Sequence, residues 1–180
     1  TSLFGTGMVI VVSRREKLLQ RLLVTPMKKI DYFLSHILSR LLIVLLEVGV
    51  VLLVGFLLFG FLIKGSFLDF IFFCFLGASC FTSLAVLCAS RGKNSSAYSG
   101  LVNLLFIFLM FLSGIWFSRN GFPFWLQPIG EYSPLSALVD ALRKIALEGM
   151  GGLSLLREGS ILVGYTLAFL LLSKRLFSWR

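Results

Sequence analysis

Long apolar runs alternate with short charged segments along this chain. Four runs, residues 41–63, 68–89, 98–117 and 159–177, match the roughly 20 residues that an α-helix needs to cross about 30 Å of hydrocarbon. We interpret all four as helices, because a single strand cannot satisfy its backbone polar groups in lipid. The pattern predicts an all-α, polytopic helical membrane protein with four full transmembrane helices.

A shorter apolar run occupies residues 1–13. Its apolar part is about half the length of a full span and is followed by Arg14 and Arg15. A signal peptide would carry positive charge before the apolar run, whereas the charge here follows it. We therefore expect a partial span at residues 1–13, and we expect the chain to be a fragment or the product of a shortened reading frame.

The composition supports a membrane location. Hydrophobic residues make up 58% of the 180 positions and include 19 phenylalanines, which is more apolar surface than one soluble core of this size can bury. The three cysteines, Cys74, Cys80 and Cys88, lie within one apolar run. Their spacing matches neither a zinc site nor a disulfide framework, so we interpret them as apolar packing residues.

The charged residues predict an orientation. If residues 14–40 are cytoplasmic, that side carries twelve of the 17 Lys and Arg residues against Glu16 and Asp31, whereas five cations face five acids on the other side. This asymmetry follows the positive-inside rule. The cations lie beside the membrane without a basic groove interleaved with aromatics, so we expect contact with membrane lipid and no nucleic-acid partner.

The cytoplasmic segment, residues 14–40, contains a short amphipathic helix. Four leucines share its apolar face: Leu18, Leu19, Leu22 and Leu23. Thr25 can cap a second helix and Pro26 suits its first position, so we expect that helix to start there and to continue into the span at residue 41. The first helix has two open interpretations: it docks into an acidic groove of a partner, or it lies on anionic lipid.

Residues 118–158 are too polar and too interrupted to span the membrane. Ser133 and Pro134 repeat the cap-then-proline signal, and the glycines from Gly149 to Gly152 end the helix that follows. Its expected apolar stripe is Leu135, Leu138, Val139, Leu142 and Ala146. Because irregular backbone at membrane depth must be covered by protein or water, we expect an outer re-entrant helical hairpin packed against the spans. A surface helix that only anchors the chain is the alternative.

Two polar residues, Glu47 and Asn103, lie inside predicted spans. Arg40 precedes Glu47 by seven residues, about 10 Å along a helix, so we expect no direct pairing without water. An intramembrane carboxylate is either a proton relay or a hydrogen-bonded structural contact, and we favour the structural role. Candidate partners on other spans are Asn103, Ser79, Thr82 and Ser83. Small residues four apart, such as Ala78 with Thr82 and Ala85 with Ala89, predict close packing of the 68–89 span.

No catalytic constellation can be assembled from these residues. His36 is the single histidine and has no companion ligand, and Gly92-Lys93-Asn94 lacks the Ser or Thr and the first Gly of a phosphate loop. No nucleophile, base and orienting partner occur together. We therefore expect no catalytic, cofactor-binding or metal-binding residues and no enzymatic activity in this chain.

Two ordered motifs resemble the type-two membrane permeases of ATP-binding cassette exporters. Arg15-Glu16-Lys17 followed by residues 20–26 resembles the loop after the family's second span. The family's fifth span and outer re-entrant segment are similar to Phe111-Leu112-Ser113-Gly114, Pro123-Phe124-Trp125-Leu126, Ser133-Pro134-Leu135 and Asp140-Ala141-Leu142-Arg143. The resemblance covers nearly the whole chain. The sequence departs from the family at Leu18 and Leu19, where Gly-Thr is common, and at Ser35 and His36, where Gly-Lys is common. It also departs at Ser118, where members carry Pro.

The resemblance implies an ATP-driven exporter in the bacterial inner membrane. The loop would carry a coupling helix for separate ATP-hydrolysing subunits, formed by Arg15, Glu16, Lys17, Leu18, Leu19, Arg21, Leu22 and Leu23. The outer segment would form a gate with Trp125, Leu126, Pro134, Asp140 and Arg143. A second permease half would complete a homodimer or heterodimer, and no cofactor is implied. The alternatives are a proton-coupled secondary transporter that uses Glu47, an inactive permease fragment and, more distantly, a membrane-embedded lipid enzyme.

Overall fold

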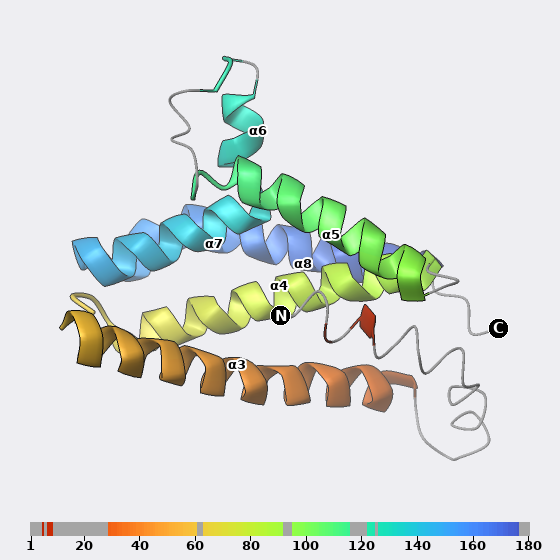
Figure 1. The fold of residues 1–180 in the computed structure, drawn as a ribbon, viewed down its shortest axis with the longest axis horizontal. Helices are drawn as coiled ribbons and strands as arrows, with labels where there is room; N and C mark the ends of the chain where they lie inside the picture. The colour runs from red at the N-terminus through yellow and green to blue at the C-terminus, as the bar shows by residue number, and fades with distance from the viewer. Residues whose placement is uncertain are drawn as a thin grey trace.

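Helices form the described part of the molecule. The computed structural model describes residues 5, 7–8, 29–60, 63–91, 95–115, 122–124 and 126–176. Three long helices run along the longest axis (Figure 1): α3 (Lys29–Phe59), α4 (Phe67–Arg91) and α8 (Leu156–Leu176). Each contains a stretch long and apolar enough to cross a membrane: Leu38–Leu58, Phe67–Ser90 and Leu156–Lys174. The all-α prediction is confirmed, and three of the four predicted full spans have span-length helices.

The predicted span at residues 98–117 corresponds to α5 (Ser95–Leu112). Its apolar stretch, Ser96–Leu112, is shorter than the other three. Just after its end, Gly114 adopts a positive φ of 75°, the left-handed conformation typical of helix ends, and Ser113 Oγ donates to the carbonyl of Met110 at 2.7 Å. Residues 113–115, which we predicted as helical, therefore do not extend α5, and residues 116 and 117 of the predicted span lie outside the described part of the chain.

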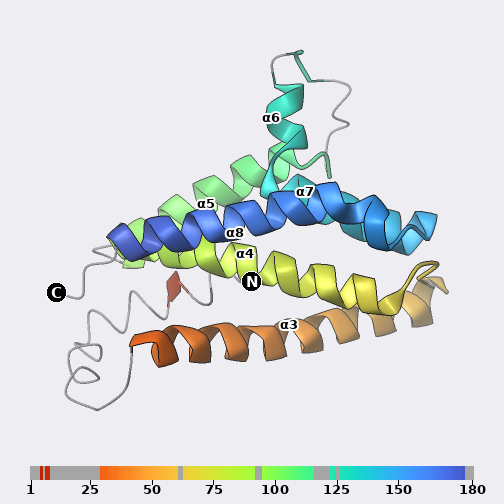
Figure 2. The ribbon, with the colours of Figure 1, turned by 180° about the vertical axis from the view of Figure 1, so that it is seen from behind.

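Four short elements connect α5 with α8. They are α6 (Gln127–Glu131), α7 (Pro134–Arg143), the π-helical turn η2 (Lys144–Glu148) and the 3-10 turn η3 (Gly152–Leu155). In two opposite views α6 projects away from the bundle, whereas α7 turns back along the long helices (Figures 1 and 2). α7 contacts both α4 and α8, so this segment packs against the spans as the sequence predicts.

The helix α4 lies at the centre of the molecule. It contacts α3 on one side and α5, α7 and α8 on the other, and its interface with α8 is the largest between described elements (Figure 2). Two buried clusters share α4. One, toward the C-terminal half of α4, contains Leu84, Ala85, Val86, Ala89, Tyr98, Val102 and Leu109. The other, toward its N-terminal half, contains Phe73, Cys80, Ala137, Ala141, Ile145, Leu155 and Leu162.

Small residues allow this central position of α4. Ala78, Thr82, Ala85 and Ala89 are all buried, which confirms the close packing predicted from their four-residue spacing. At Gly77 an added Cβ would lie 2.5 Å from the side chain of Leu138 on α7. The absence of a side chain at Gly77 therefore sets how closely α7 approaches α4.

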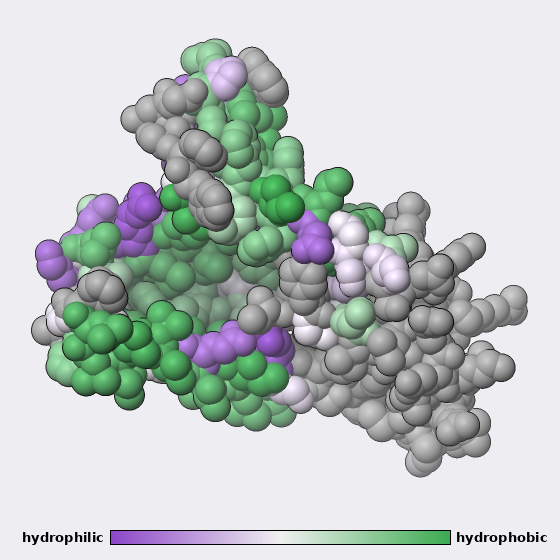
Figure 3. Space-filling view, viewed as in Figure 1, coloured by the Kyte–Doolittle hydropathy of each residue, from purple (hydrophilic) through white to green (hydrophobic). Residues whose placement is uncertain are grey.

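The helix α3 is peripheral. Only 6% of its span-length stretch is buried, against 50% of the stretch in α4. Where the surface of α3 is coloured in Figure 3, it is mostly apolar, and a hydrophilic patch interrupts it. α3 is continuous from Lys29 into the span, as predicted for the second cytoplasmic helix, whose expected start at Thr25 and Pro26 lies outside the described residues.

Candidate functional site

The first polar contact lies along α3, between two residues separated by about two helical turns. Arg40 Nη2 lies 3.5 Å from Glu47 Oε2, and the Arg40 side chain is buried. Our expectation that these groups do not pair directly is wrong. The roughly 10 Å between them is the rise of the helix axis, and the long arginine side chain covers most of that distance. In an apolar setting, pairing is favoured because an isolated charge is costly.

This pair changes the charge map as well. Arg40 lies inside the span-length stretch Leu38–Leu58, so it is not one of the free cytoplasmic cations of the predicted map. Eleven cations then remain on the predicted inner side against Glu16 and Asp31. The predicted orientation still agrees with the positive-inside rule, and Glu47 is paired with Arg40.

The other polar residues that we named as candidate partners of Glu47 differ in their environments. Ser79 Oγ donates to the carbonyl of Phe75 at 2.9 Å, and Ser83 Oγ donates to that of Ser79 at 2.8 Å. The Thr82 hydroxyl is buried without a hydrogen-bond partner among the described residues. Asn103 is exposed on α5. These positions therefore do not form a polar cluster around Glu47 in the described part of the chain.

The predicted outer gate is partly described. Trp125 lies outside the described residues, Leu126 is half-buried immediately before α6, and Pro134 is the buried first residue of α7. Ser133 occupies the N-cap position as predicted, but its buried hydroxyl makes no capping hydrogen bond. Only the backbone of Ser133 contributes, since its carbonyl accepts from the amide of Ala137 at 3.0 Å.

The buried face of α7 differs from the predicted stripe. Ala137, Ala141 and Ile145 are fully buried, whereas the predicted residues Leu135, Leu138, Val139 and Leu142 are half-buried; Ala146, the fifth, is buried. Close contact with α4 and α8 requires small residues at the centre of the face, and the larger leucines pack on either side of it. Asp140 is half-buried and Arg143 is exposed, so the two charged gate residues lie toward the rim of α7.

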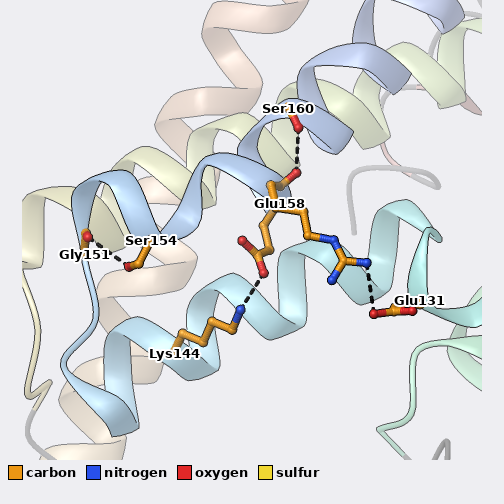
Figure 4. A network of polar contacts seen from close by, with 7 residues as sticks. Glu131, Lys144, Gly151, Ser154, Glu158 and Ser160 are labelled. Carbon is orange, nitrogen blue, oxygen red and sulfur yellow. Dashed lines mark hydrogen bonds and ion pairs between the residues drawn. The ribbon is translucent and has the colours of Figure 1, made fainter.

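An ion pair that the sequence analysis missed joins η2 to α8. Lys144 Nζ donates to Glu158 Oε1 at 2.7 Å (Figure 4), and the Glu158 side chain is 7% exposed. Its second carboxylate oxygen is buried without a hydrogen-bond partner among the described residues. Glu158 lies in the first turn of α8, where the helix dipole stabilises a negative charge. An acidic residue after the glycine run was the only sequence signal for this contact.

A more exposed pair joins α6 to α8. Arg157 Nη2 donates to Glu131 Oε1 at 2.9 Å, and its guanidinium lies 5.3 Å from the centre of the Tyr132 ring. About half of each charged side chain is exposed. Solvent screens such an exposed pair, so the contact contributes little to stability.

Backbone groups make a further connection between η2 and the turn that joins α3 to α4. The carbonyl of Ile145 accepts from the amide of Gly65 at 3.0 Å, and that of Ala146 accepts from the amide of Lys64 at 3.2 Å. The last carbonyls of a helix have no amide partner within it. The α3–α4 turn thus caps η2, and Gly65 is required because a Cβ there would lie 2.6 Å from the Ile145 oxygen.

The contacts of this region position helices relative to one another. No group of three His, Cys, Asp or Glu side chains in the described ranges could hold a metal ion, and the cysteines are unpaired thiols. The predicted coupling residues, from Arg15 to Leu23, all lie outside the described part of the chain.

One comparison with known proteins gives a match. The family model described as ABC-2 type transporter matches residues 1–147. No curated protein and no solved structure matches the chain.

Proposed function

This chain belongs to the ABC-2 type transporter family, and we propose that it forms one half of an export path driven by separate ATP-hydrolysing subunits. It is an integral membrane permease component of an ABC transporter. The family match over residues 1–147 carries the proposal. Three span-length helices and the buried α4 support it, because a path between two halves requires a stable wall in each.

We propose that ATP-driven motion enters through residues 14–24. In the predicted orientation this amphipathic segment lies on the cytoplasmic side, a few residues before the helix that continues into α3. Closure of two ATPase subunits would move it, tilt the spans and open a path to the outer side between this chain and a second permease half. The apolar face of Leu18, Leu19, Leu22 and Leu23 would fit a groove in the ATPase, and the flanking charges would set its orientation.

The outer gate is the second proposed functional part. Leu126, Pro134, Asp140 and Arg143, together with Trp125, belong to the segment between α5 and α8. The packing of α7 against α4 and α8 supports this role, because it places a non-spanning helix beside the spans. We place the protein in the bacterial inner membrane, with a second copy or a related permease as its partner.

The rival function is proton-coupled transport through Glu47. The contact between Glu47 and Arg40 supports a structural role for the carboxylate instead, because it gives the buried Arg40 guanidinium a partner. If the chain is an exporter, transport does not depend on the proton gradient either in wild type or in Glu47→Gln. In a proton-coupled transporter, wild type would depend on the gradient and Glu47→Gln would remove that dependence.

Affinity purification of the full-length protein in mild detergent tests the proposal. Wild type is compared with Leu22→Glu, which puts a charge on the apolar face of the coupling segment, and with the matched control Gln20→Glu on its polar face. We expect ATPase subunits and ATP hydrolysis to accompany wild type and Gln20→Glu, and to be lost with Leu22→Glu. Absence of an ATPase from all three preparations would overturn the exporter function.

A further inference from the structure

The middle of α3 presents a charged side chain at a depth where a membrane helix ordinarily presents apolar ones. Glu47 lies nine residues from Leu38 and eleven from Leu58, the ends of the span-length stretch, which places it about 14 Å and 17 Å from them along the helix axis. Its side chain is 39% exposed, although its Oε2 lies 3.5 Å from Arg40 Nη2. The ion pair therefore reaches the surface of this chain close to the midplane of a bilayer.

A second polar side chain reaches the surface at a similar depth on α5. Asn103 is exposed, and it lies seven residues from Ser96 and nine from Leu112, the ends of the apolar stretch of α5. The two helices lie on opposite sides of α4. Figure 3 shows hydrophilic surface on both α3 and α5 on the same face of the molecule, and a hollow beside the hydrophilic patch of α3, between α3 and α7. Two helices that flank α4 thus each present a polar group on one face.

Lipid is an unfavourable neighbour for this face. A charged side chain exposed to hydrocarbon at the bilayer midplane is costly, so such side chains lie against protein or in a water-filled cavity. The Arg40 side chain is buried and lies beside residue 5, since a Cβ built on Gly5 would be 3.8 Å from its Nη1. The Glu47 carboxylate is therefore the outward end of the pair. Because it borders a hollow of the surface, water is the neighbour that this site favours.

We propose that the Glu47 side of α3 and the Asn103 side of α5 line a hydrated part of the export path. This assignment rests on the proposed function and deepens it, because it names the face of this permease half that bounds the path. It also indicates a class of substrate. The outward group of the ion pair is a carboxylate, a hydrogen-bond acceptor with negative charge. The path therefore favours groups that donate hydrogen bonds, such as hydroxyl and ammonium groups, over anions.

The reaction of single cysteines with a water-soluble thiol reagent tests the hydrated face. Val51 lies four residues after Glu47, about 40° around the helix, whereas Leu46 and Leu57 lie about a quarter of a turn away in the other direction. The side chains of Val51, Leu46 and Leu57 are 69%, 67% and 69% exposed. A difference in reactivity between them therefore reports what surrounds the chain and not its own packing.

Each cysteine is placed in the full-length protein in lipid nanodiscs, whose two faces are both open to buffer. The native cysteines are first replaced by alanine: Cys74, Cys80 and Cys88. We expect a cationic methanethiosulfonate to modify Val51→Cys at least about tenfold faster than Leu46→Cys and Leu57→Cys, because the reactive thiolate forms in water and not in hydrocarbon. Equal rates on the two sides of α3, whether fast or slow, would overturn the proposal. Slow modification everywhere is the result expected if a second permease half covers this face.

The same comparison on α5 uses Ile107→Cys and Phe108→Cys. Ile107 lies four residues after Asn103, and Phe108 lies a further 100° around the helix; both side chains are more than half exposed. We expect modification of Ile107→Cys to be at least about tenfold faster than that of Phe108→Cys. Slow modification of Ile107→Cys would overturn the assignment of α5 to the hydrated face.

Removal of the ion pair tests whether its polar groups hold the water. In the Val51→Cys protein, the double change Arg40→Met with Glu47→Met leaves an apolar surface, so we expect modification to slow about tenfold. The same double change in the Leu46→Cys protein is the control, and its slow rate should not change. An unchanged rate at Val51→Cys would overturn the role of the pair.

Two reagents of opposite charge test the class of substrate. A trimethylammonium and a sulfonate methanethiosulfonate are compared at Val51→Cys, which leaves Glu47 in place, and each rate is divided by the rate of that reagent with a small thiol in buffer. We expect the cationic reagent to be favoured by about threefold or more, because the outward carboxylate attracts it. Equal corrected rates, or a faster anionic reagent, would overturn the preference for hydrogen-bond donors.

These outcomes are separate from those of the proposed function, because the labelling requires neither ATP nor an ATPase subunit. Co-purification of an ATPase together with slow modification of Val51→Cys would support the exporter and overturn the hydrated face. Fast modification of Val51→Cys in a protein that brings no ATPase would support the hydrated face and overturn the exporter.

Discussion

The helices α3 and α4 are neighbours of similar type but occupy opposite environments. The span-length stretch of α3 is made mostly of leucine and valine, yet only 6% of it is buried, whereas half of the α4 stretch is buried. The buried positions of α4 include alanine, serine and threonine at the closest contacts. The larger side chains of α3, such as Leu46 and Leu57, remain exposed.

This difference follows from the solvent. In water, the most apolar helix would lie at the centre, because burial removes its surface from water. In a bilayer, lipid tails are as apolar as leucine, so helices associate through close packing of small residues and through hydrogen bonds between them. A stretch of large apolar residues therefore indicates a helix that faces lipid or another subunit. A row of small residues indicates a helix that packs closely against its neighbours at the centre of the fold.

The largest effect is expected from enlarging a buried small residue of α4. Ala85 has no exposed surface, so Ala85→Phe must displace its neighbours and should lower the free energy of unfolding by about 3 kcal/mol. Leu46→Phe on α3 is the control and should change it little. Unfolding in mixed micelles measures both. Equal losses for the two variants would remove the distinction between α3 and α4.

A smaller loss is expected from breaking the ion pair on α3. Glu47→Gln leaves the buried Arg40 guanidinium without its charged partner, which should cost about 2 kcal/mol of unfolding free energy. The double variant Arg40→Met with Glu47→Met should cost less than Glu47→Gln alone, because it leaves no uncompensated charge. A double variant that costs as much as the two single changes added would show that the pair is not coupled.

Replacing a glycine by alanine should change the free energy of unfolding in opposite directions on α4 and on α3. A Cβ at Gly77 on α4 meets Leu138 at 2.5 Å, whereas one at Gly49 on α3 meets nothing within 4 Å. Gly77→Ala should destabilise by about 1 kcal/mol, because the clash exceeds the gain in helix propensity. Gly49→Ala should stabilise by up to about 1 kcal/mol. Thermal unfolding in detergent measures the sign, and stabilisation by both changes would be evidence against tight packing of α7 on α4.

The smallest effect is expected at exposed leucines of α3. Leu46→Ala and Leu57→Ala remove side chains that contact little within this chain, so each should change the free energy of unfolding by less than about 0.5 kcal/mol. The same substitution at a leucine in a packed core lowers the free energy of unfolding by about 2–5 kcal/mol. Losses of that size, measured by chemical unfolding in micelles, would place these side chains inside a protein interface.

Sequence patterns correctly predicted those features of the fold that depend on the residues of a single helix. The length of apolar runs predicted α3, α4 and α8, and four-residue spacing of small residues predicted the packing face of α4. The Ser133-Pro134 signal correctly predicted the first residue of α7, although the serine hydroxyl makes no cap. These signals are local, and the bilayer sets the required length independently of tertiary contacts.

Contacts between distant segments were not predictable in this way. The capping of η2 by Lys64 and Gly65 and the pair of Lys144 with Glu158 depend on how α7 returns to the spans. The Arg40–Glu47 pair is local but was misjudged, because the distance along the helix axis was taken as the distance between the charged groups. The buried face of α7 was misjudged because hydropathy favours leucine, whereas close packing favours alanine.

The exposure of α3 and the burial of α4 can be measured directly by tryptophan quenching with brominated lipid. In a background with the three native tryptophans replaced by phenylalanine, Leu53→Trp and Phe73→Trp lie at matched depths, each six residues from the adjoining helix ends at Phe59 and Phe67. Val51→Trp tests another face of α3, in case a second permease half covers one of them. We expect strong quenching in at least one α3 variant and little in Phe73→Trp. Quenching of Phe73→Trp as strong as that of both α3 variants would contradict the central position of α4.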